Sequence, residues 1–185
     1  MNIIFNFPAF TILLSLLCAG IGYAVRGKKS KVLSLCLLTA CFIMNACALI
    51  YCILNGAFTY QMGHFPAPWG NEIRMGILES LFSSVFSLVM LLCLMGGKIR
   101  LQLDLAEDKR HFYFVMTDLI QASLLVLCYT NDIFTGYVFI EICTLATCSL
   151  LMIRQLGRTT LAAVRYMIFS LIGSGLFLLG VTILY

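Results

Sequence analysis

Six long apolar segments, separated by short polar ones, make up nearly all of the chain. They cover about residues 3–25, 32–54, 75–95, 112–129, 133–153 and 161–184. A helix that crosses the hydrocarbon core of a bilayer needs about 20 consecutive, mostly apolar residues. The runs are continuous and show no period of two, so they favour helices over a closed barrel. The pattern therefore predicts an all-α membrane protein with about six transmembrane helices.

The composition agrees with a chain that lipid covers. Hydrophobic residues make up 62% of the 185 positions and charged residues 11%, and the mean hydropathy is +1.02. A soluble domain carries about 25% charged residues, so too few charges remain here to coat a water-facing surface. No positive charge precedes the first segment, and its apolar run is too long for a signal peptide. We therefore expect a retained membrane anchor.

The basic residues predict the orientation of the chain in the membrane. Loops 26–31, 98–111 and 154–160 hold ten of the twelve Lys and Arg residues, and by the positive-inside rule these loops are cytoplasmic. The N-terminus and the loop 55–74 are then outside, and the chain is a multi-pass protein of the cell membrane. In that outer loop Gly63, Pro66, Pro68 and Gly70 favour irregular structure. We expect His64 to be solvated and Trp69 to be an interfacial anchor. The net charge of +4 does not indicate nucleic-acid binding, because the basic residues lie in short loops that set the orientation.

Glu141 is the principal candidate for a functional residue. It follows Asp132 by nine positions, which places it about 13 Å from the outer surface and near the bilayer midplane. An ionisable group at the centre of a spanning helix costs roughly 2.5–3.5 kcal/mol on insertion scales, and such groups commonly mark ion pathways. Desolvation disfavours the charged form of a carboxyl group, which suits a proton relay at neutral pH. The alternative is a buried glutamate that only bonds a neighbouring helix.

Three more ionisable residues fall inside predicted spans. Arg165 is always protonated, and it either holds Glu141 ionised through water or snorkels to the cytoplasmic interface. Asp118 is interpreted as similarly shallow. It either joins a hydrated path or pairs with Arg165, or else it snorkels to the interface or caps its helix. Glu79 lies in the first turns of the third span, where a carboxylate favours the helix N-terminus. A structural role is preferred for Glu79, with an accessory role in the path as the alternative.

The sequence offers no motif for a metal or a cofactor, and we expect this chain to bind neither. All nine cysteines fall inside predicted spans, without a CxxC pair or a nearby histidine, so they are interpreted as small packing residues. No phosphate-binding loop or nucleophile triad is present. Gly173, Ser174 and Gly175 form a small-residue patch that predicts close helix packing.

Three separated stretches resemble one known family. They are YQMGHFPAPWGNEIR at 60–74, YTNDIFTGYVFIEI at 129–142 and AAVRYMIFSLIGSGLFLLG at 162–180. In order and spacing they resemble the antiporter-like membrane subunits of proton-translocating NADH:quinone oxidoreductases and Mrp-type cation/proton antiporters. The subgroup resembles the D-type antiporter subunit or its relatives in hydrogenase complexes.

The resemblance implies helices one to six of a fourteen-helix subunit. Residues 1–111 would hold helices one to three, and residues 112–185 the incomplete first half of an inverted-repeat proton-channel unit. Glu141 would take the role of the family's fifth-helix glutamate. Arg165 stands where the family usually has lysine, and Gly76 where it often has aspartate. The broken seventh helix, where such transporters place an ion site, is absent. We expect a fragment of a longer subunit, with a split subunit as the alternative.

The predicted function is translocation of protons, or of Na⁺ in exchange for protons, within a multisubunit complex. The expected partners are the lipid bilayer, other membrane subunits and the ions themselves. A structural subunit that anchors its partners and moves no ions is the alternative. Membership of such a complex would class the chain with NADH:quinone oxidoreductases, although it carries no catalytic site of its own. A quinone-dependent enzyme is therefore ranked last.

Overall fold

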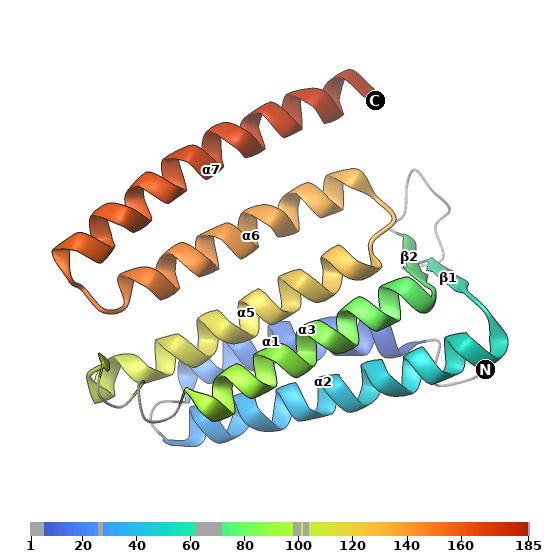
Figure 1. Cartoon of the computed structure of the whole chain (residues 1–185), viewed down its shortest axis with the longest axis horizontal. Coiled ribbons are helices and arrows are strands. Elements are labelled where there is room, and N and C mark those ends of the chain that lie inside the picture. The colour runs from blue at the N-terminus through green and yellow to red at the C-terminus, as the bar shows by residue number, and fades with distance from the viewer. Residues whose placement is uncertain (1–5, 26–27, 62–71, 98–100, 102–103, 185) are drawn as a thin grey trace.

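Six long helices form the body of the protein, as the apolar pattern predicts. The computed structural model describes residues 6–25, 28–61, 72–97, 101 and 104–184 (Figure 1). All six helices are long and apolar enough to cross a membrane. They are α1 (Phe7–Ala24), α2 (Lys28–Asn55), α3 (Ile77–Gly96), α5 (Arg110–Tyr129), α6 (Ile133–Met152) and α7 (Gly157–Leu184).

Three helices, α2, α5 and α7, begin earlier than predicted, and local sequence explains where others begin. Helices α2 and α7 each start four residues before the predicted apolar segment, at Lys28 and Gly157, because a helix can continue into the polar flank. Pro8 lies in the first turn of α1, where its missing N–H costs nothing. Asp132 caps α6 by accepting hydrogen bonds from the backbone N–H groups of Phe134 and Thr135 at 3.4 and 2.8 Å.

Helix α5 lies at the centre of the bundle. It packs against α1, α2, α3 and α6, whereas α7 packs chiefly along α6 at the edge (Figure 1). Over half of α5 is buried within the chain, against 6% of α7. The main apolar cluster joins α1, α2 and α5, and includes Ile12, Leu37 and Leu125. Helices α6 and α7 therefore leave broad apolar faces on the outside of this bundle.

The segment 55–74 is not irregular throughout, and that prediction was wrong at the ends of the loop. Strands β1 (Phe58–Gln61) and β2 (Glu72–Met75) pair antiparallel, with Phe58 opposite Met75. Alternating side chains such as Ile73 and Met75 are buried beneath β2, which is why the chain pairs there. His64 and Trp69 lie outside the described residues.

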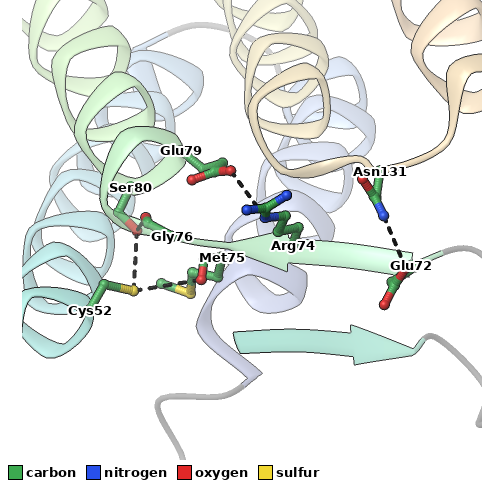
Figure 2. Close-up of polar contacts among 8 residues, drawn as sticks. All are labelled: Cys52, Glu72, Arg74, Met75, Gly76, Glu79, Ser80 and Asn131. Atoms are coloured by element: carbon green, nitrogen blue, oxygen red, sulfur yellow. Dashed lines mark hydrogen bonds and ion pairs between the residues drawn. The ribbon is translucent and has the colours of Figure 1, made fainter. Parts of the chain in front are cut away.

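Strand β2 also connects this loop to the turn between α5 and α6. Ile73 forms a β-bridge with Thr130, and the backbone N–H of Asn131 donates to the carbonyl oxygen of Glu72 at 3.0 Å. The Asn131 side chain donates to the Glu72 carboxylate at 3.0 Å (Figure 2). One end of the bundle is thereby held together by a small sheet.

Polar contacts join the loops at the opposite end. Arg154 bonds Asp104 at 3.0 Å, and Lys109 donates to the side chain of Gln155. A short 3-10 helix, η3 (Glu107–Lys109), leads into α5. These contacts join the two basic loops 98–111 and 154–160, which the sequence predicts to be cytoplasmic.

The small-residue patch of α7 does not make the predicted close packing within the described chain. A side chain at Gly173 or Gly175 would meet nothing within 4 Å. The tight approach between α6 and α7 is instead at Ala163, which is fully buried and whose carbonyl oxygen lies 3.8 Å from the Cys148 sulfur. The glycines therefore face space that this chain does not fill.

We expect Ala163→Leu to destabilise the helix pair, because the added methylene groups have no room against α6. Overpacking a filled site costs about 1–3 kcal/mol. The neighbouring Ala162 is exposed, so Ala162→Leu should change the free energy of unfolding by less than about 0.5 kcal/mol. Reversible unfolding of the two variants in mixed micelles measures the difference. Equal stabilities would contradict this packing of α6 on α7.

Candidate functional site

Glu141 lies at the middle of helix α6. It is the ninth residue of a 20-residue helix, so it is about 12 Å from the helix start and near the midplane of a span. Its side chain is half-buried. Among the described residues no hydrogen bond or ion pair to its carboxylate is present. The carboxylate is therefore available to groups that this part of the protein does not supply.

Glu141 faces helix α7. Tyr137 stacks on Phe177 of α7 with ring centroids 6.3 Å apart, and Cys148 approaches Ala163 of the same helix. Positions 137, 141 and 148 fall on one stripe of a helix, because they are four and seven residues apart. Between these two contacts Glu141 lies level with about residue 172, beside the uncrowded glycines of α7.

Arg165 is not brought to Glu141. It lies about seven residues from the level of Glu141, or about 10 Å along the helix axis. Ala163 faces α6, and a residue two positions later points about 200° round the helix. Arg165 is accordingly exposed on the outer side of α7, without an ion-pair partner in the described chain.

Asp118 lies on the other side of the central helix from Glu141, and the interpretation of Asp118 as shallow was wrong. It is the ninth of 20 residues in α5 and only 1% exposed, so its carboxylate cannot snorkel to the interface. Ser34 of α2 donates a hydrogen bond to its Oδ1 atom at 2.5 Å. The expected pair with Arg165 is absent, because α7 packs along α6 and not along this face of α5.

A chain of buried polar side chains continues from Asp118 between α2, α3 and α5. Gln121 donates to the Ser87 hydroxyl at 2.8 Å, and Asn45 donates to the same oxygen at 3.0 Å. The Tyr129 hydroxyl donates to Asn45 Oδ1 at 2.9 Å and lies 2.6 Å from the Ser83 hydroxyl. We call these residues the polar seam: Ser34, Asn45, Ser83, Ser87, Asp118, Gln121 and Tyr129.

Sequence reasoning missed the polar seam because its members are mostly uncharged. One signal was present: Asp118, Gln121 and Tyr129 are separated by three and eight positions, which places them on one face of a helix. The serines of α3 at 80, 83, 84 and 87 form a similar stripe, and all are buried. Polar stripes inside predicted spans therefore pointed to the interior of the bundle.

Glu79 lies at the hairpin end of the bundle, in the first turn of α3. Its Oε1 atom is 3.6 Å from Nε of Arg74 on β2 (Figure 2). Arg74 is largely exposed, so this ion pair is worth at most about 1 kcal/mol. A Cβ atom at Gly76 would come within 2.5 Å of Glu79 Oε2, which shows that the carboxylate curls over the helix start. This geometry supports the structural role of Glu79.

The sequence is similar to named antiporter subunits over nearly its whole length. It is 30% identical, across 97% of this chain, to antiporter subunit mnhD2 of Staphylococcus haemolyticus and of Staphylococcus aureus. The resemblance to antiporter-like subunits is confirmed. The chain spans 36% of the length of these relatives, which fits the N-terminal portion of such a subunit. No family model matches the sequence.

A solved structure has the same fold as this chain. It is that of the membrane-bound sulfane sulfur reductase, an archaeal respiratory membrane complex. The match has a TM-score of 0.80 at 20% sequence identity and covers 98% of this chain and 36% of that chain. The arrangement of the six helices is therefore that of part of a larger membrane subunit.

We expect Tyr129→Phe to destabilise the helix bundle through the polar seam. Loss of the hydroxyl leaves Asn45 Oδ1 without its donor, and an unsatisfied buried polar group costs about 1–3 kcal/mol. Tyr137 is the matched control, because its hydroxyl makes no hydrogen bond in the described chain and its ring stack survives in Tyr137→Phe. Unfolding free energies in micelles give the comparison. A Tyr129→Phe variant as stable as the control would contradict the network.

Proposed function

We propose that this chain translocates protons, or Na⁺ in exchange for protons, as part of an antiporter-like subunit of a multisubunit membrane complex. Glu141 would be the proton carrier near the bilayer midplane. The position of Glu141 is the observation that supports this most strongly: it lies at mid-helix, half-buried, with no partner in the described chain. An ionisable side chain at that depth is costly, and such side chains usually belong to ion paths.

The relatives offer a reason why Glu141 lacks a partner here. They are nearly three times longer than the matched region, so further helices could cover the open side of α6 and α7. In this proposal residues 112–185 form part of the ion-conducting unit and residues 1–111 support it. Transporters of this kind place ion sites at broken helices within such repeats.

Arg165 would act on Glu141 at a distance. It lies about 10 Å along the helix axis from the level of Glu141, and its always-protonated guanidinium would contribute a fixed positive charge to the proposed path.

Glu141→Gln in the complete complex tests the carrier role. We expect ion transport in everted membrane vesicles to fall at least tenfold, because an amide cannot hold and release a proton at neutral pH. Glu141→Asp should retain part of the activity. The control is Glu107→Gln, which alters an exposed ion pair with Arg110 outside the spans. Undiminished transport by an assembled Glu141→Gln complex would reject the assignment.

The structural alternative rests on the broad apolar faces of α6 and α7. In that case the chain would anchor partner subunits without moving ions. Glu141→Gln would then weaken assembly and leave transport per assembled complex unchanged. Quantifying the assembled complex beside its transport separates the two functions.

The orientation in this proposal places the N-terminus and the β1–β2 hairpin outside the cell. Arg158→Cys should then react with a membrane-impermeant maleimide only from the cytoplasmic side, and Asn131→Cys only from the outside. Both positions are exposed, and they lie at opposite ends of the bundle. Labelling of intact cells and of everted vesicles checks the prediction. The reverse pattern would overturn the positive-inside assignment.

A further inference from the structure

The polar seam extends through much of the membrane-spanning interior. Helices α2 and α5 run parallel, and Ser34 pairs with Asp118 and Asn45 with Tyr129 at the same sequence separation of 84 residues. From Ser34 to Asn45 the seam rises about 16 Å along the helix axis. Beyond Tyr129, the Ser80 hydroxyl contacts the Cys52 sulfur at 3.7 Å, near the hairpin (Figure 2). Polar groups therefore follow one another across at least half of a bilayer core about 30 Å thick.

Two buried polar atoms along this line have no hydrogen-bond partner. Gln121 Oε1 lies one turn from Asp118 on α5, and Ser30 Oγ lies one turn from Ser34 on α2. Gln121 is 0% exposed and Ser30 is 1% exposed. Buried polar atoms in native proteins nearly always bond to protein or to an ordered water. The two atoms lie on opposite sides of Asp118 along the axis, so they mark where water would meet its carboxyl group.

Asp118 has no cation to balance a negative charge. No Lys or Arg of the described chain pairs with it, and its one hydrogen bond comes from Ser34. The titratable groups of neighbouring helices that interact with it are the thiols of Cys18 and Cys41, which carry no positive charge. Burying an unpaired carboxylate costs several kcal/mol, a cost that is avoided when the group holds a proton.

We propose that the polar seam is a hydrated proton path with Asp118 as its proton-holding group, separate from the path through Glu141. The proton on Asp118 passes to a water at Gln121 Oε1, and a water at Ser30 Oγ returns a proton to the carboxylate. Only O–H bonds break and form, so charge and atoms balance. Water bound to the hydroxyls of Ser87, Ser83 and Tyr129 then carries the protons toward the hairpin, while the amides of Asn45 and Gln121 donate hydrogen bonds without giving up protons. The proposal deepens the proposed function by adding a second route for the same ion.

The two carboxyl groups are on different sides of α5. Asp118 faces α2, whereas Glu141 projects from α6 toward α7. No described hydrogen bond connects the polar seam with α6. Each route can therefore be tested without disturbing the other.

Infrared spectroscopy of the complete protein tests whether Asp118 holds a proton and meets water. We expect a protonated-carboxyl band at neutral pH that disappears in Asp118→Asn and persists in Glu141→Gln. In D₂O the band should shift within seconds, because water reaches the group. A missing band, or one that does not exchange, would overturn the proposal whatever the result for Glu141.

Transport measurements test whether the seam conducts. Asp118→Asn keeps the shape of the side chain and should abolish the proton flux that remains in Glu141→Gln vesicles, and Gln121→Leu should lower that remaining flux severalfold. The control is Ser123→Ala: Ser123 is buried on α5, but its hydroxyl bonds only its own helix at Leu119, so flux should stay within twofold. If Glu141→Gln leaves no flux, or if Asp118→Asn does not lower the flux that remains, the seam is rejected and the proposed function stands. If neither changes flux, both are rejected.

Discussion

The burial of helix α5 is the constraint on which the rest of the structure depends. This helix contacts α1, α2, α3 and α6, so each of its faces must suit a different neighbour. The face toward α2 and α3 carries Asp118, Gln121 and Tyr129, whose polar atoms must find partners inside the bundle because lipid offers none. Ser83 and Ser87 of α3 and Ser34 and Asn45 of α2 supply most of those partners. Hydrogen bonding across α5 therefore fixes the register of the three helices.

The same central helix separates the chain into two regions of different character. On one side, α1, α2 and α3 enclose a closed polar interior. On the other, α6 and α7 form an open pair with Glu141 between them and apolar faces outside. A carboxyl group at similar depth occurs in each region. In the closed region Asp118 accepts a hydrogen bond from Ser34, whereas in the open region the Glu141 carboxylate has no polar partner among the described residues.

The hairpin between α2 and α3 connects the two regions at one end of the bundle. Strand β2 pairs with β1, bridges to the turn between α5 and α6, and carries Arg74, which reaches the start of α3. A single short strand of the α2–α3 connection thus contacts both the α5–α6 turn and the start of α3. Such a sheet restricts the relative movement of α3, α5 and α6 at that end, where the polar seam approaches the hairpin.

Much of this protein follows from its sequence alone. Segment length and continuous hydrophobicity determined the number of helices and the last residue of each to within one position, because the bilayer admits few alternatives. The depth of Glu141 also follows from counting residues along its helix. The sequence does not determine which face of each helix points into the bundle. An apolar span shows almost no periodicity when lipid and protein interior are equally apolar. Only the tertiary structure decided that Asp118 is buried against Ser34, that Arg165 points away from Glu141, and that uncharged residues join into one seam. Those outcomes depend on which helix surfaces meet, and that is set by packing and hydrogen bonds between residues far apart in the chain.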